Sequence, residues 1–152
     1  MVKKLKDLQN KKGKKGFSMI ELIIVIAIMA ILVALIGTQL IPYLEKSRES
    51  RDKTTLDTIL TSYQSVVAEY EFSLPDGNSV TLSSADAWKP DSDMKEQFEK
   101  YAGLSDTDKP FKSDKVDKNK AKTYGDVKIT YTDDGVIEKA EVGSLEVSTS
   151  KN

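Results

Sequence analysis

The sequence predicts an α+β protein, in which a long N-terminal α-helix with a membrane half and an amphipathic half packs on a small antiparallel β-sheet headgroup. Three observations lead to this prediction. Residues 22–41 form an uncharged apolar run of twenty residues, which as a helix is long enough to cross the core of a bilayer. An amphipathic stretch follows it directly. Further on, short segments alternate apolar and polar residues, as half-buried strands do.

The composition excludes several kinds of catalytic and metal site. The 152 residues include no Cys and no His, which rules out disulfides, Cys-based zinc sites and Ser-His triads. We identify no catalytic residue, and we expect no metal and no cofactor. Three pairs of aspartates lack the glycine and the closing glutamate of an EF-hand loop, so we interpret them as solvated loop residues rather than calcium ligands. These pairs are Asp91 and Asp93, Asp106 and Asp108, and Asp114 and Asp117.

The charge is divided unevenly along the chain. Residues 1–16 hold seven lysines and one aspartate, a net charge of +6, whereas residues 17–152 hold 16 basic and 23 acidic residues, a net charge of −7. Lysines next to an apolar run stay at the cytoplasmic face of a membrane. We therefore expect the basic segment inside the cell and the acidic body across the membrane.

We divide the chain into four segments: a basic leader (1–16), an apolar helix half (17–42), an amphipathic helix half (43–73) and a globular headgroup (74–152). In the third segment, apolar residues recur at steps of three and four and form one stripe. Just before the stripe, Arg48 and Asp52, and Glu49 and Lys53, are four apart and can pair on a solvated face. The stripe comprises Leu56, Ile59, Leu60, Tyr63, Val66, Val67 and Tyr70.

Gly37 and Pro42 weaken the middle of the predicted helix. Proline has no N–H to donate to the preceding turn and clashes with it. We therefore predict a kink or local melting between these two residues.

The headgroup pattern predicts one short helix and a sheet. Ser92 or Asp93 can cap a helix that ends at Ala102, and Met94, Phe98 and Tyr101 would share one of its faces. Residues 79–82, 127–132, 136–142 and 145–148 read as strands, with Asp133–Gly135 as a turn. Residues 107–122 read as a loop. We interpret Trp88 and Tyr101 as packing residues, in the core or between subunits.

The order of features around Gly16 is unusual for a targeting segment. Residues 11–21 read KKGKKGFSMIE, so the small residue of a cleavage site comes before the apolar run instead of after it. A cut after Gly16 would remove the lysines and leave the apolar helix intact.

At these residues the sequence resembles the type IV pilin family and the type II secretion pseudopilins. Their hallmark is a short basic leader that ends in Gly, then Phe, a Glu five residues into the mature chain, and about twenty apolar residues. Gly16, Phe17 and Glu21 match those positions. The resemblance implies cleavage after Gly16 by a prepilin peptidase, which also N-methylates Phe17. Many Gram-negative pilins close a C-terminal loop with two Cys, whereas this Cys-free chain resembles Gram-positive pilins, and its loops would be held by packing alone.

Glu21 has a physical interpretation of its own. A carboxylate in a membrane run costs about 2.5–3.5 kcal/mol and is usually functional. After cleavage Glu21 would lie in the first helical turn, where the helix dipole favours negative charge, four residues from the new ammonium of Phe17. In pilin-like filaments the partner would be the Phe17 ammonium of a neighbouring subunit. The alternative is a glutamate solvated by lipid head groups.

The sequence therefore predicts a structural protein rather than an enzyme: a major pilin, held by one membrane helix before assembly and then polymerised into an extracellular filament on the bacterial surface. Its expected partners are further copies of itself, the prepilin peptidase, the membrane and the pilus assembly machinery. The alternatives are a pseudopilin or minor pilin, and a membrane-tethered binding module. We do not expect nucleic-acid binding, because the lysines of residues 109–122 alternate with aspartates, although a contact of this cluster with DNA or a partner subunit stays open.

Overall fold

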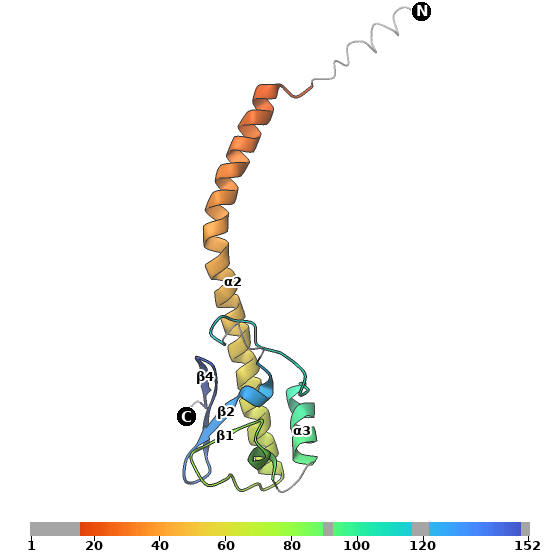
Figure 1. The fold of residues 1–152 in the computed structure, drawn as a ribbon, viewed down its shortest axis with the longest axis vertical. Helices are drawn as coiled ribbons and strands as arrows, with labels where there is room; N and C mark the ends of the chain where they lie inside the picture. The colour runs from red at the N-terminus through yellow and green to blue at the C-terminus, as the bar shows by residue number, and fades with distance from the viewer. Residues whose placement is uncertain (1–15, 90–92, 117–121, 150–152) are drawn as a thin grey trace, which may run out of the picture. The chain divides into compact units, whose positions relative to one another are not determined.

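The computed structural model describes residues 16–89, 93–116 and 122–149. The predicted leader up to residue 15, the proposed cap Ser92 and part of the lysine cluster therefore lie outside the described residues. The elements are α2 (Met19–Glu69), β1 (Ser79–Thr81), η1 (Ala85–Trp88), α3 (Asp93–Ala102), η2 (Tyr124–Asp126), β2 (Lys128–Tyr131), β3 (Ile137–Val142) and β4 (Leu145–Ser148) (Figure 1). The predicted α+β class, with a long N-terminal helix and a small antiparallel sheet, is confirmed.

The chain forms two compact units, Met1–Ile41 and Pro42–Asn152. Helix α2 contributes to both, because it continues through Gly37 and Pro42. These two residues therefore do not end the helix, and the kink predicted between them stays a prediction. By length and composition, α2 is suited to cross a membrane.

In the second unit, the sheet is built from neighbours in chain order. All three pairings are antiparallel, in the order β1-β2-β3-β4, and Ile129 faces Val80 on one side and Ala140 on the other. Alternate residues point inward, so that Ile129 and Tyr131 of β2 are buried. The outward face carries Lys139, whose ammonium contacts Glu141 on its own strand and Glu146 on β4. The sheet thus has one apolar face and one charged face.

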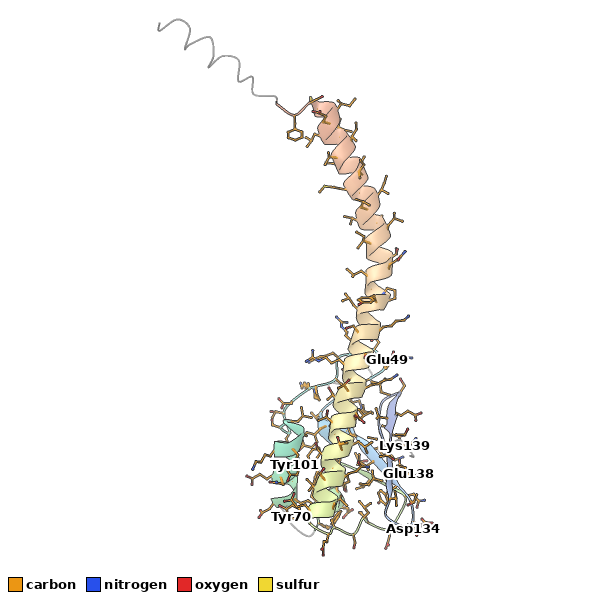
Figure 2. The ribbon with its side chains drawn as sticks, turned by 180° about the vertical axis from the view of Figure 1, so that it is seen from behind. Glu49, Tyr70, Tyr101, Asp134, Glu138 and Lys139 are labelled. Atoms are coloured by element: carbon orange, nitrogen blue, oxygen red, sulfur yellow. The ribbon has the colours of Figure 1, made fainter. Side chains whose placement is uncertain are left out.

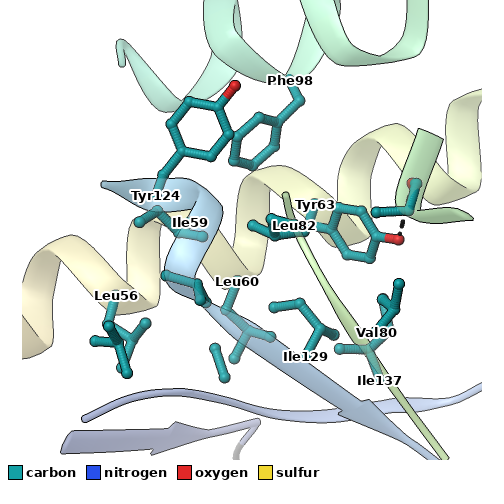
Figure 3. Packing of buried hydrophobic residues seen from close by; sticks show 14 of the residues in the cluster. Leu56, Ile59, Leu60, Tyr63, Val80, Leu82, Phe98, Tyr124, Ile129 and Ile137 are labelled. Carbon is teal, nitrogen blue, oxygen red and sulfur yellow. Dashed lines mark hydrogen bonds between the residues drawn. The ribbon is translucent and has the colours of Figure 1, made fainter. Parts of the chain in front are cut away.

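The second half of α2 covers the apolar face of this sheet. Leu56, Ile59 and Tyr63 are fully buried, which confirms the predicted stripe. Figure 3 shows these side chains between the sheet and α3, with the Tyr63 hydroxyl donating to the carbonyl of Ala87 at 3.1 Å. The Tyr63 ring also meets Phe98 of α3, with ring centroids 6.4 Å apart. The C-terminal half of α2 is therefore the central element of the headgroup.

The two aromatic residues interpreted as packing residues have different positions. Trp88 lies in the core, where its indole N–H donates to the carbonyl of Leu82 at 2.8 Å. Tyr101 is 45% exposed, and its hydroxyl contacts Glu69 at the end of α2. By its spacing Tyr101 shares a helix face with Met94 and Phe98, and of these three only Met94 and Phe98 are buried. Tyr101 lies at the edge of that face.

A buried carboxylate fixes the loop that follows α3. Asp52 is fully buried and accepts hydrogen bonds from the backbone N–H of Lys112, at 2.9 Å, and of Ser113, at 2.7 Å. Glu45 accepts the next N–H, that of Asp114. Three successive backbone donors are thus satisfied by two acidic side chains of α2, as buried or partly buried polar groups require.

This arrangement corrects two expectations. The predicted pair of Arg48 with Asp52 is wrong, because Asp52 turns into the headgroup and Arg48 contacts Glu45 at 3.6 Å. The second predicted pair, Glu49 with Lys53, is confirmed at 3.1 Å. The expectation that the loops are held by packing alone is also wrong, since Asp52 hydrogen-bonds the loop backbone.

The β3–β4 turn closes on the far end of the same loop. The N–H and the hydroxyl of Ser144 both donate to the carbonyl of Lys115 at 2.9 Å. Gly143 before it has φ +61°, and a Cβ at this position would lie 2.7 Å from the same carbonyl oxygen. Only glycine fits so close to the loop backbone.

Helix α2 ends in a Schellman motif. The N–H of Phe72 donates to the carbonyl of Val67 at 2.9 Å, and that of Glu71 to Ala68 at 3.4 Å. Glu71 takes the left-handed conformation, with φ +48°, at the position where glycine is usual. Phe72 and Val67 both pack against the core, which accounts for a strained residue between them.

Replacing Asp52 with asparagine should destabilise the headgroup by about 1–3 kcal/mol, because an NH2 group in place of Oδ1 would face the N–H of Lys112 at 3.0 Å, donor against donor, and the charge that strengthens the remaining bonds is lost. Thermal unfolding of the full chain in detergent would measure the loss. The matched control is Glu49→Gln, which removes an exposed pair and should change stability by about 0.5 kcal/mol or less. Equal effects of the two substitutions would contradict the role assigned to Asp52.

Replacing Glu71 with glycine should stabilise the headgroup by about 1 kcal/mol, because glycine adopts positive φ without steric cost. The same unfolding measurement applies. Glu71→Ala serves as the control, since alanine keeps the Cβ and should leave stability nearly unchanged. A gain with alanine as large as that with glycine would show that the charge, not the backbone, is the source of strain.

Candidate functional site

The N-terminus of α2 is closed by two bonds in the pattern of a capping box, with the Ser18 hydroxyl paired to the N–H of the second helical residue instead of the third. Ser18 precedes the first helical residue, and its hydroxyl accepts a hydrogen bond from the N–H of Ile20 at 3.3 Å. In return, the Oε2 atom of Glu21 accepts the N–H of Ser18 at 2.8 Å. These two reciprocal bonds satisfy donors that the start of a helix leaves unpaired. Glu21 is therefore a helix-capping residue in the uncleaved chain.

The two capping bonds also determine which acceptor atoms of Glu21 stay available for a partner. Its second oxygen, Oε1, has no hydrogen bond within the described part of the chain, and the residue is exposed. The carboxylate thus keeps one free acceptor oxygen and its charge, beside a helix end that favours negative charge. It can accept one further cationic donor without breaking the cap.

The bond between Gly16 and Phe17 is accessible. Residues 16–18 lie outside the helix and are exposed, and the Phe17 side chain is 85% exposed. A Cβ built at Gly16 would meet no atom within 4 Å. The folded chain therefore gives no steric reason for a glycine here, so any requirement for glycine must come from a molecule that binds this segment.

Apolar side chains surround the helix on all sides from Phe17 to Ile41. Every residue in this range is exposed, and Figure 2 shows the side chains directed outward all around this part of α2. Soluble monomers rarely expose apolar patches of more than a few hundred Å². This surface therefore requires either lipid or other protein chains as its surroundings.

A second polar cluster lies in the headgroup, around Tyr124. Its hydroxyl is 2.5 Å from Glu99 of α3 and from Asp106. Burial, and then the two carboxylates, raise the pKa of Tyr124, so that its phenol stays protonated and donates a hydrogen bond. The hydrogen bonds from Lys95 and Tyr124 lower the pKa of Asp106. The cluster joins α3 to η2, which is a structural role.

The acidic loops do not come together. Among residues 16–89, 93–116 and 122–149, no group of three or more carboxylate side chains is placed to hold a metal ion. Asp91 and Asp117, each one of a pair considered as calcium ligands, lie outside the described residues.

The sequence placed Gly16, Phe17 and Glu21 together, and in the structure they lie within the first turn of α2 and the residues before it. It did not identify Ser18. The signal was present, because Ser18-Met19-Ile20-Glu21 has the Ser-x-x-Glu spacing of a capping box just before an apolar run. The carboxylate was interpreted only through its charge, and its hydrogen bond to the backbone was missed.

A comparison with known protein families identifies the kind of segment that surrounds Gly16 and Phe17. Residues 11–37 match the family described as the prokaryotic N-terminal methylation motif, which is the class III signal peptide of type IV pilins. No curated protein and no solved structure matched the chain.

The motif supports a prepilin-type protein, either pilin-like or pseudopilin-like, which is a structural class. It suggests processing by a prepilin peptidase and assembly into a pilus. Together with the apolar helix, it fits anchoring in the membrane before assembly. The match confirms the resemblance found in the sequence for this segment.

Proposed function

We propose that the chain is the major pilin of a type IV pilus. It is held in the cell membrane by residues 17–42 until a prepilin peptidase cleaves after Gly16 and methylates Phe17. It then polymerises through its N-terminal helix into an extracellular filament. The filament serves motility, adhesion or surface attachment.

The observation that carries this proposal is the combination of an accessible Gly16–Phe17 bond with a capped helix whose apolar surface is uncovered. A plain membrane anchor needs the apolar surface, but a neutral glutamine would cap its helix equally well, without the cost of about 2.5–3.5 kcal/mol for a charge in a membrane. A subunit that assembles side by side with its copies uses both features. Lipid covers the helix first, and neighbouring helices replace it.

Cleavage supplies the partner that Glu21 lacks. Hydrolysis of the Gly16–Phe17 bond adds water across the amide, which leaves a carboxylate on the leader and an amine on Phe17. The amine is protonated and can donate to Oε1 of Glu21 on a neighbouring copy, while Oε2 keeps its bond to Ser18. Among apolar helices such a pair is strongly favoured over two separate buried charges. The same cut therefore removes the lysines and creates the donor.

The processing step can be checked by mass spectrometry of sheared surface fibres. We expect a chain that begins at Phe17 and is heavier by one methyl group. A chain that begins at Met1 in assembled fibres would contradict the cleavage. A correctly processed chain found only in membrane fractions would contradict polymerisation and indicate a tethered module.

Two substitutions separate the charge of Glu21 from its capping role. Glutamine also serves at this position of a capping box, so Glu21→Gln keeps the hydrogen bond to Ser18 and loses the charge, whereas Glu21→Ala loses both. We expect both variants to be cleaved normally and both to lose filaments, by roughly tenfold or more if the pair contributes about 1.4 kcal/mol per subunit. The readout is the fibre yield relative to processed chain in the membrane.

Ser18→Ala is the matched control, because it removes one capping bond and keeps the Glu21 charge. Its expected cost is about 1 kcal/mol of local helix stability, with filament yield much less affected than in Glu21→Gln. Normal fibres from Glu21→Gln would refute the charge pair and leave capping as the role of this residue.

A further inference from the structure

A basic groove lies beside the turns of α2 that carry Arg51, Thr55 and Thr58. Arg51, Lys109 and Lys112 contribute the cations, and Ala102, Leu104 and Pro110 line it with apolar atoms. The groove has a volume of about 370 Å³. Asp108 is its one carboxylate, and it is already used by the N–H of Ser105 at 2.8 Å. No ion pair of the three cations is found within the described part of the chain.

The opposite charge gathers on the β2–β3 turn. Asp133 and Asp134 are exposed, and Asp76 lines the same hollow beside them. The turn is rigid: Gly135 donates to the carbonyl of Thr132 at 2.9 Å with φ +77°, and the Thr132 N–H donates to the carbonyl of Val136 at 2.9 Å. These three aspartates, named here the acidic tip, have no ion pair among the described residues.

The basic groove and the acidic tip lie at opposite ends of the headgroup. Arg51 lies in the part of α2 nearer the start of this unit. The tip is instead joined to the segment that follows the helix, because Tyr131 donates hydrogen bonds to the carbonyls of Asn78 and Pro75, each at 3.0 Å. The stretch of α2 from Arg51 to Glu69 spans about 27 Å. Figure 2 shows Asp134 at the end of the headgroup where Tyr70 lies, away from Glu49.

We propose that the basic groove receives the acidic tip of another copy of this chain. This inference rests on the proposed polymerisation and adds a second contact to it, made by headgroups instead of N-terminal helices. Because the two surfaces differ and lie at opposite ends, the contact is head-to-tail and leaves a free groove and a free tip on every pair. Such an interface extends into an open filament.

Charge decides in favour of a second copy over a polyanion. Residues 17–152 carry a net charge of −7, which repels nucleic acid, an anionic membrane and a second copy alike when each is taken as a whole, so the choice rests on the local match of charges. The same acidic excess supplies the tip, whose carboxylates match the three cations of the groove. Complementary charges of this kind fix register and exclude wrong orientations more than they add affinity.

A charge-swap experiment in cells that assemble the full chain tests this contact. The tip variant is Asp133→Lys with Asp134→Lys, and the groove variant is Arg51→Glu with Lys109→Glu. Each should lower the yield of sheared fibres by roughly tenfold, because like charges would face each other, while processed chain in the membrane stays at the wild-type level. The combined variant should recover most of the yield, since the coupling is restored with reversed sign.

Matched control substitutions are Asp57→Lys and Lys100→Glu, which reverse exposed charges that line neither surface. Together they should leave fibre yield near the wild-type level. Provided that the wild-type chain forms fibres, the proposed contact would be overturned by either of two results. One is an unchanged fibre yield in the tip and groove variants, and the other is no recovery of yield in the combined variant. Absence of fibres from the wild-type chain would overturn the proposed function itself. Loss of DNA binding in the groove variant, with fibre yield unchanged, would assign the groove to a polyanion instead.

Discussion

The uncovered apolar surface of α2 is the constraint on which the rest of the structure depends. In the second half of the helix, the sheet and α3 cover that surface, so residues such as Ile59 and Tyr63 are fully buried. In the first half no part of the described chain does so. Hydrophobic burial scales with area removed from water, which means that the first half has to find a bilayer or other chains before the molecule is stable. The headgroup is complete in itself, and the N-terminal unit is not.

In the headgroup, the long connection between α3 and β2 must be held in place without a disulfide. Hydrogen bonds from the loop backbone to an acidic side chain and to a turn hold this connection. Asp52 reaches from α2 into the core and holds the backbone of Lys112 and Ser113, and the β3–β4 turn holds Lys115 through Ser144. A buried carboxylate with backbone N–H partners fixes one conformation of the loop, because any other leaves a buried polar group unsatisfied. The same loop then presents Lys109 and Lys112 at the surface.

The sequence predicted those parts of the fold that rest on periodicity. The stripe around Tyr63, the helix that ends at Ala102 and the strands around the Asp133–Gly135 turn all follow from spacing and turn chemistry. Asp52 could not be found in this way, since an acid four residues after Arg48 looks like half of an exposed pair until the loop that covers it is known. The period also places Tyr101 on the same helix face as Met94 and Phe98, but only tertiary packing sets where the buried part of that face ends.

At the candidate site, the sequence located the residues but not their local bonding. Gly16, Phe17 and Glu21 were recognisable from their order and spacing. The capping bond between Glu21 and Ser18 depends on where α2 begins, and the boundaries of an element are what a sequence pattern determines least well. An apolar run without a visible break hides that boundary. The match of residues 11–37 to the N-terminal methylation motif supports the class of the protein without reaching the headgroup.

The cap at Ser18 has a consequence for the accuracy of any filament. If the chain is cut after Gly16, Phe17 is the only residue left before the capping residue Ser18, so few rotatable backbone torsions separate the new amine from the helix. The amine then occupies nearly the same place in every copy. In a polymer, small differences in the position of each subunit along the filament axis accumulate. A loosely attached terminus would allow such differences, because the amine could pair with Glu21 from many positions. A short, capped end instead makes the spacing of the whole fibre a property of one helical turn.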